Sequence, residues 1–390
     1  MRYNFDEIID RRNSDSIKWG QLEELYGDED VLPLWIADMD FRSADEIVEA
    51  IKERADHGVF GYIYMKDSFY QSIIDWVKRR FNWEIKKEWI LFTPGVVMGF
   101  NIGVRELVDK GDKVLVQPPV YPPFYRVLDN NGRVPLENPL KHDGERYVMD
   151  FEDLEEKAAD SSLIMLCNPH NPVGRVWTRE ELDRLGQICV ENDITIISDE
   201  IHCDFTLKGV EHTPMASLSK ELEQQTITLM APSKTFNIAG LTTSVAIIPN
   251  EELREKYTKA LEVMEVGNPT IFGALALETA YKHGEEWLDE VMVYVEDNID
   301  YAIQYIKENI PEIKVDRPDG TYLLWLDFRS LNKSNDEIEK ALIEEGKVAL
   351  NDGRPYGTGG DGFFRLNIGC PRSILKDGLQ RIEKAVKGMK

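Results

Sequence analysis

Cysteine is scarce in this chain. There are four, with no Cys-x-x-Cys pair among them: Cys167, Cys189, Cys203 and Cys370. Scattered single cysteines lack the ligand spacing of a structural zinc site and are typical of proteins from a reducing compartment. We therefore expect no bound metal.

Long apolar segments are also missing. The opening residues 1–6 lack the apolar core of a signal peptide. One of the two longest uncharged windows, residues 89–104, is broken by Pro94, Gly95 and Gly99 and is too short to span a bilayer. We expect a cytoplasmic protein that does not insert into a membrane.

Basic residues are outnumbered, with 46 Lys and Arg against 71 Asp and Glu, which gives a formal net charge of -25. Such a field repels polyanions and argues against nucleic acid or an anionic membrane as a partner. With 390 residues, 42% of them hydrophobic and 30% charged, the chain is long enough for a large domain and a smaller one.

Short apolar runs alternate with helical patterns between residues 88 and 250, which predicts an α/β fold with a mainly parallel sheet covered by helices. The predicted strands are 90–92, 113–116, 163–167, 194–197, 226–230 and 243–248. Helices are predicted over 178–191, where Thr178 and Glu181 form a capping box, and over 285–309. A separate α+β lobe is predicted at the end, from strands at 322–328 and 363–366, a helix at 336–345 and a terminal helix.

Lys234 follows the strand predicted at 226–230, within the segment APSKTFN at 231–237. A lysine after a strand is most often a solvated loop residue. In a partly desolvated pocket, however, its amine loses charge easily, and a neutral amine attacks carbonyl groups to form a Schiff base. The neighbouring hydroxyl groups of Ser233 and Thr235 are suited to a phosphate.

Three more polar loops follow predicted strands: TPGVV at 93–97, NPHNPVG at 168–174 and SDEIH at 198–202. The first opens a helix, whose free N–H groups can accept a phosphate. The third places Asp199 where a strand ends, and a semi-buried carboxylate there needs a cation or several donors. Each loop alone has an ordinary structural explanation, but together they converge on the sheet edge where open α/β folds bind ligands.

These four loops, in this order and spacing, resemble the pyridoxal-phosphate enzymes of aminotransferase fold type I over nearly the whole chain. The segments PLWIADMDF at 33–41 and GFFRLNIGCPR at 362–372, with the opening at 6–19, are similar to its cystathionine β-lyase branch, the MalY/PatB type. The resemblance implies a large domain at 46–285. A small domain would combine an N-terminal segment, 1–45, with residues 286–390.

The resemblance implies pyridoxal 5'-phosphate as cofactor and gives the catalytic roles to Lys234, Asp199 and Tyr121. Lys234 would hold the cofactor covalently and move the α-proton of the substrate. Asp199 would pair with the ring nitrogen, and Tyr121 would stack on the ring. The remaining cofactor contacts would come from Gly95, Val96, Val97, Asn171, His202, Ser233 and, in a homodimer, Tyr62 of the neighbouring subunit.

The substrate contacts implied are Arg365, Ala37 and Asn171. Arg365 would bind the α-carboxylate with two parallel hydrogen bonds, and the backbone N–H of Ala37 would meet the same group. Without the resemblance, Arg365 would be interpreted as a surface ion-pair residue.

Two positions depart from the pattern of many fold-type-I aminotransferases. Thr242 replaces an arginine that clamps the phosphate, so neutral donors must hold it. His202 replaces a tyrosine that donates to the ring oxygen, and an imidazole there is expected to add a pH dependence.

The function implied is a carbon–sulfur β-lyase that eliminates the thiol from L-cystathionine or a related S-substituted cysteine, leaving pyruvate and ammonia. Tyr121 and Tyr62 remain alternatives for assisting the leaving group. The alternative functions are an aminotransferase, which uses the same lysine, acid and arginine, and a regulatory binding protein that retains the lyase fold.

The stretch GTGGDG at 357–362 matches the dinucleotide-binding pattern by letter, but it leads into a strand instead of opening a helix. We therefore exclude a nicotinamide dehydrogenase. The sequence does not choose between cystathionine and other S-substituted cysteines.

Overall fold

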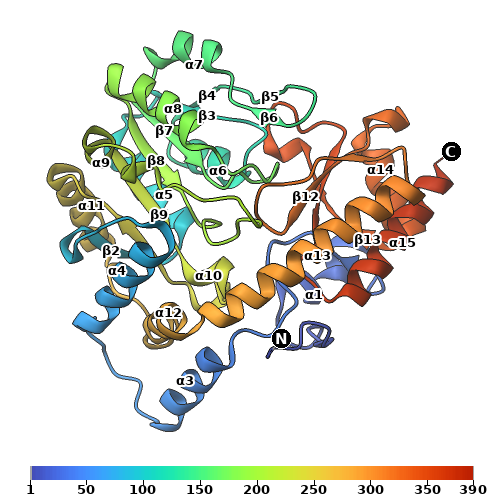
Figure 1. Ribbon diagram of the computed structural model, residues 1–390, viewed down its shortest axis with the longest axis horizontal. Coiled ribbons are helices and arrows are strands. Elements are labelled where there is room, and N and C mark those ends of the chain that lie inside the picture. The colour runs from blue at the N-terminus through green and yellow to red at the C-terminus, as the bar shows by residue number, and fades with distance from the viewer. Residues whose placement is uncertain (1, 390) are drawn as a thin grey trace.

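A seven-stranded sheet forms the centre of the computed structural model, which describes residues 2–389 (Figure 1). Its strand order is β2-β10-β9-β8-β7-β3-β4. The strands in this order are Ile90–Thr93, Ser244–Ile247, Thr226–Met230, Thr195–Asp199, Leu163–Cys167, Lys113–Val116 and Val134–Glu137. Only β10 pairs antiparallel with its neighbours, so the sheet is mostly parallel.

Helices cover both faces of this sheet because its strands are apolar on both sides. In β7, Leu163, Met165 and Cys167 pack in one core with α5, α6 and α11, whereas Ile164 and Leu166 pack in another with α7 and α8. Burial on both faces is what a parallel sheet requires. These helices span Val96–Leu107, Pro123–Asn130, Glu251–Met264, Phe151–Ala158 and Arg179–Glu191.

A second, four-stranded sheet lies beside the first, in the order β11-β12-β15-β14. Its strands are Lys314–Val315, Leu323–Asp327, Phe363–Asn367 and Asn351–Asp352. The helices α13 (Glu285–Asn309), α14 (Asn335–Ala341) and α15 (Arg372–Gly388) complete this region (Figure 1).

The N-terminal segment joins this second region. Strand β1 (Leu32–Pro33) pairs in parallel with β13 (Val348–Ala349), so residues more than 300 positions apart are neighbours. The short helices α1 (Ile17–Gly20) and α2 (Leu22–Tyr26) lie in the same part of the chain.

Further elements include four helices and one hairpin. Helix α12 packs against α3 and α4, and these three helices lie in the lower left of the view in Figure 1. The elements are α3 (Asp45–Asp56), α4 (Asp67–Phe81), α9 (Lys220–Gln225), α12 (Ile271–His283), β5 (Lys141–His142) and β6 (Tyr147–Val148).

The α/β fold class predicted from the sequence is confirmed, and three predicted strands, 113–116, 163–167 and 226–230, have the bounds observed. The edge strand β4 was not predicted. The helix predicted over 336–345 ends earlier, at Ala341, and continues as a π-helical turn over Leu342–Gly346.

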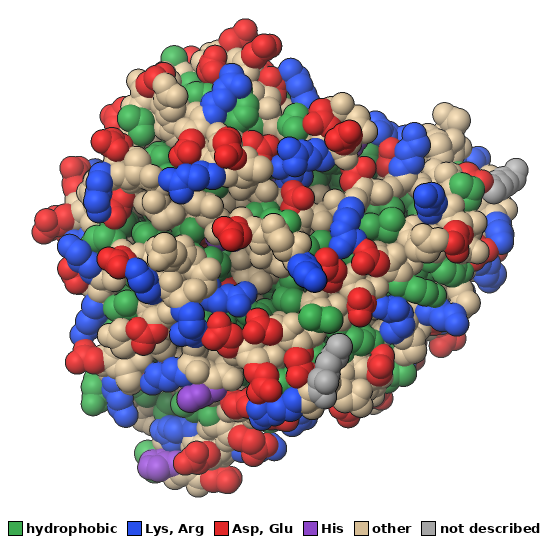
Figure 2. Space-filling view, viewed as in Figure 1, with side chains coloured by type: hydrophobic (Ala, Val, Ile, Leu, Met, Phe, Trp, Pro, Cys, Tyr) green, Lys and Arg blue, Asp and Glu red, His purple; other side chains and the backbone are tan. Residues whose placement is uncertain are grey.

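Acidic and basic side chains are interspersed on the face shown in Figure 2, and no continuous basic region is visible on that face. Among residues 2–389, no helix is long and apolar enough to cross a bilayer.

Candidate active site

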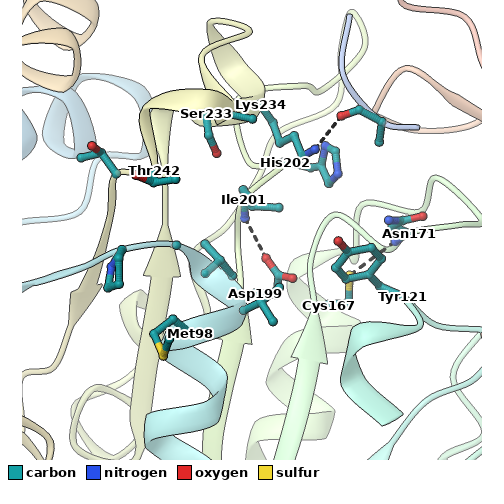
Figure 3. Close-up of a pocket in the computed structure, with 17 residues that line it drawn as sticks. Met98, Tyr121, Cys167, Asn171, Asp199, Ile201, His202, Ser233, Lys234 and Thr242 are labelled. Atoms are coloured by element: carbon teal, nitrogen blue, oxygen red, sulfur yellow. Dashed lines mark hydrogen bonds between the residues drawn. The ribbon is translucent and has the colours of Figure 1, made fainter. Parts of the chain in front are cut away.

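A cavity of about 260 Å³ opens at the carboxyl edge of the large sheet, where β2, β7, β8 and β9 end. This is the edge at which open α/β sheets bind ligands. Figure 3 shows side chains from these separate strand ends projecting into one space. The lining residues are Ala37, Pro94, Gly95, Val96, Val97, Met98, Tyr121, Cys167, Asn171, Asp199, Ile201, His202, Ser233, Lys234, Ala239, Thr242 and Thr243.

Asp199 is the last residue of β8, and the sheet register places it beside Cys167 of β7. It is buried, and within the described residues its side chain accepts one hydrogen bond, from the N–H of Ile201 at 3.1 Å. Burial raises the pKa of the Asp199 carboxyl to about 7, because the charged form has lost its water. A cationic ring nitrogen would satisfy this carboxylate.

Lys234 lies on the single-turn helix α10 (Pro232–Thr235), which follows β9 directly. Its Nζ donates a hydrogen bond to the carbonyl oxygen of Ala37 at 2.5 Å. Desolvation lowers the pKa of this amine to about 8, from an ordinary value of 10.5. A useful fraction of Lys234 is therefore neutral, and nucleophilic, near neutral pH.

The other end of the cavity is built for a phosphate. Helix α5 begins after Gly95, which has φ +140° and open space where a side chain would project. No side chain caps this helix, so the N–H groups of its first turn can face an anion. The hydroxyl-bearing residues Ser233 and Thr242 line the same cavity.

Arg365, on β15 of the second sheet, is 3% exposed and is hydrogen-bonded to Asn171, which lines the cavity. Its Nη1 donates to Asn171 Oδ1 at 3.0 Å and its Nη2 to the carbonyl of Trp35 at 2.9 Å. Its Nε has no hydrogen-bond partner in the described part of the chain. A buried guanidinium with spare donors is suited to a carboxylate ligand, so the interpretation as a surface ion-pair residue does not hold.

His202 lines the cavity with its Nδ1 unpartnered within residues 2–389. Burial, with the nearby Lys234 and Arg365 charges, lowers its pKa to about 3. The ring is therefore neutral at ordinary pH, and the pH dependence expected from its protonation is not supported by the structure.

Except for Tyr62, the predicted site residues lie together in the structure. Arg365 is joined to the cavity through its hydrogen bond with Asn171. Tyr62 lies fully exposed between α3 and α4, outside the cavity of its own chain. For several lining residues no role is predicted from the sequence: Pro94, Met98, Cys167, Ile201, Ala239 and Thr243. Ile201 could have been predicted to line the cavity, because it lies two residues after Asp199 in the loop at 198–202.

The family model described as aminotransferase class I and II matches residues 29–382 of this chain. The chain is 46% identical to cystathionine beta-lyase PatB of Bacillus subtilis over 98% of this chain and 100% of that protein. It is 33% identical to protein MalY of Escherichia coli, with 100% of both chains covered.

Among solved structures, the chain is similar to cystalysin from Treponema denticola, which contains a pyridoxal 5'-phosphate cofactor. The TM-score is 0.97 and the identity 36%, over 100% of both chains.

Proposed function

Because this chain belongs to the family of class I and II aminotransferases, in the branch of PatB and MalY, we propose that it is a pyridoxal-phosphate-dependent carbon–sulfur β-lyase. Its substrates are L-cystathionine or related S-substituted cysteines. The observation that carries the proposal is one cavity holding a desolvated lysine, a buried acid and an uncapped helix start, joined to a buried arginine through Asn171.

The residues of the cavity fit this cofactor. The buried Asp199 needs a cationic partner, the start of α5 with Ser233 suits a phosphate, and Lys234 supplies an amine for covalent attachment. The remaining proposed contacts are Gly95, Val96, Val97, Tyr121, Asn171 and His202, all of which line the cavity. When bound, pyridoxal phosphate supplies electron withdrawal from the substrate's Cα.

Lys234 has two tasks in this proposal. Its Nζ would hold the cofactor covalently, and as a free amine it would take the proton from the substrate's Cα. Asp199 would be the anionic partner of the cofactor's ring nitrogen. Tyr121 would pack against the ring, and the neutral His202 and Asn171 would be donors for its phenolic oxygen.

Arg365 orients the substrate through its α-carboxylate, together with Asn171 and the N–H of Ala37. With Cα and Cβ held in this way, loss of the Cα proton allows the Cβ–S bond to break, and the thiol leaves with a proton. The remaining three-carbon fragment takes up water and becomes pyruvate and ammonia. The donor of the leaving-group proton is Tyr121 or Tyr62.

A homodimer completes the site in our proposal, with Tyr62 reaching the phosphate of the neighbouring subunit. The segment around it exposes Val59, Phe60, Tyr62 and Tyr64, and a contiguous group of exposed apolar residues is typical of an interface. We also propose a large domain at 46–285 and a small domain formed by 1–45 and 286–390, of which Met1 and Lys390 lie outside the described residues.

A cytoplasmic location remains part of the proposal, supported by four buried free cysteines.

The test is to incubate the cofactor-loaded protein with L-cystathionine in the absence of any 2-oxo acid and to follow pyruvate and free thiol together. Equal and continuing release of both supports the β-lyase. Product formation only after addition of a 2-oxo acid would identify an aminotransferase instead, with the same fold and the same lysine.

A further inference from the structure

Residues 35–41 are here called the 35–41 segment. Several of its backbone carbonyl groups accept hydrogen bonds from side chains in distant parts of the chain. The carbonyl of Ala37 accepts hydrogen bonds from Lys234 at 2.5 Å and from the Tyr322 hydroxyl at 2.9 Å. The flanking carbonyls of Ile36 and Asp38 both accept from the Asn367 side chain. The Ala37 carbonyl is therefore a fixed acceptor for the Lys234 amine.

A cluster of four charged residues lies against the same segment. Lys18, on α1, is 1% exposed and donates to Asp40 at 2.6 Å and to the carbonyl of Asp38 at 3.2 Å. Its Nζ lies 3.6 Å from the Asp38 carboxylate. Arg11 pairs with both acids, each at 2.6 Å.

Stability alone is a weak explanation for this cluster. A buried ion pair gains little over well-packed apolar residues, because removing the charges from water costs about as much as their attraction returns. Lys18 instead holds the backbone next to Ala37, and its charge acts on the nearby amine. The positive Lys18 lowers the pKa of Lys234, and the negative Asp38 raises it.

We propose that Lys18 and Asp38 are a pair of positioning residues for Lys234, which hold the Ala37 carbonyl against its amine and act on it with opposite charges. The inference rests on the proposed role of Lys234 as the cofactor-binding lysine. It assigns a task to the N-terminal helix α1, which lies outside the cavity and contributes no lining residue.

Other groups also face Lys234. Asp199 at the end of β8 raises its pKa, and Arg365 on β15 lowers it. The neutral His202 is near, and the Tyr322 hydroxyl shares the same acceptor. Within the described residues, none of these four side chains forms a hydrogen bond or ion pair with the side chain of Lys18 or Asp38. We therefore expect each variant to remove one charge and to leave these four in place.

The test measures how fast the full-length, cofactor-free protein captures pyridoxal phosphate covalently as a function of pH, with borohydride trapping and peptide mass mapping. Only the neutral amine reacts, so capture at Lys234 rises with pH around a midpoint near the pKa of about 8. In Lys18→Met we expect this midpoint to move up by about half a pH unit or more, and in Asp38→Asn to move down. Lys18→Arg should restore the original midpoint.

Arg133→Met is the matched control. Arg133 is a buried cation that donates to the Val108 and Arg105 carbonyls. It directly precedes β4, an edge strand of the large sheet, and so lies at the amino end of that strand, whereas the cavity lies at the carboxyl ends of the strands. Its loss should leave the midpoint unchanged. If Lys18→Met does not fold, Asp38→Asn decides alone, since its carboxylate is partly exposed.

A midpoint that stays fixed in the folded variants, or that moves in the same direction in both, would overturn the positioning role. Failure of the wild-type chain to capture the cofactor at Lys234 would instead overturn the proposed function on which the inference rests.

Discussion

The amine of Lys234 donates a hydrogen bond to the carbonyl oxygen of Ala37 at 2.5 Å, across 197 positions of the chain. Lys234 follows a central strand of the large sheet, whereas Ala37 lies close to β1, which pairs with the second region. The two regions thus meet at the lysine. Their contact excludes water from the amine and lowers its pKa to about 8.

Replacing the lysine tests its chemistry. We expect Lys234→Ala to fold, to bind pyridoxal phosphate only non-covalently and to lower kcat for elimination by at least about 10³-fold, because the proton-moving group is lost. Absorbance of the bound cofactor and pyruvate release measure the two effects. Lys220→Ala, at a highly exposed lysine, should keep both properties, and full activity of Lys234→Ala would refute the mechanism.

Asp199 should make the free energy of unfolding of the cofactor-free protein depend on pH. Its carboxyl has a pKa of about 7 in the folded chain, against 3.8 as its ordinary value. Between about pH 4 and pH 7 the folded chain therefore keeps a proton that the unfolded chain has released, so the free energy of unfolding falls as the pH rises. Above about pH 7 the buried Asp199 carboxylate is charged in the folded chain, and its lost hydration lowers the free energy of unfolding by the full amount.

Asp199→Asn removes this cost. We expect the variant to raise the Tm of the cofactor-free protein more at pH 7.5 than at pH 5, while lowering the activity of the loaded enzyme. Thermal unfolding at the two pH values measures the difference. The control is Asp183→Asn at an exposed site, and an equal Tm change at both pH values would argue against the buried acid.

Arg365 should act on substrate binding. In Arg365→Lys the charge remains, but the planar pair of donors is lost, so we expect kcat/KM to fall by roughly 10- to 100-fold, mainly through KM. Initial rates over a range of L-cystathionine concentrations provide the measurement. Arg329→Lys, at an exposed arginine, is the control, and an unchanged KM in Arg365→Lys would remove Arg365 from the substrate site.

Tyr62 should act across a dimer interface. We expect Tyr62→Ala to bind the cofactor several-fold more weakly than the wild type, although the residue lies outside the cavity of its own chain. Gel filtration with equilibrium dialysis of the cofactor checks this. Dilution of the wild type to monomers should have the same effect, and unchanged cofactor retention by a verified monomer would contradict the shared site.

Local sequence patterns predicted six of the seven strands of the large sheet and four polar loops that contribute to the cavity, whereas the roles of the site residues came from the family resemblance. The strand at 163–167 is a continuous apolar run, as burial on both faces requires, and it is followed directly by the loop that contains Asn171. The glycine stretch at 357–362 was correctly set aside, since it precedes β15 and opens no helix.

Contacts between distant segments were beyond these patterns. Nothing around Lys18 marks it as buried, because lysine is usually exposed and its partners Asp38 and Asp40 lie about 20 residues later. The position of β10 between β2 and β9 likewise depends on how the whole sheet assembles. Met98 enters the cavity from the first turn of α5, where an apolar residue is equally typical of the core.

The most direct test of the central claim, that the amine of Lys234 carries the cofactor, is borohydride reduction of the loaded protein followed by peptide mass mapping. We predict one equivalent of reduced cofactor on the peptide that contains Lys234 and none on Lys18, a buried lysine that lies outside the cavity. A label on any other lysine, or no stable label on a fully active protein, would contradict the account.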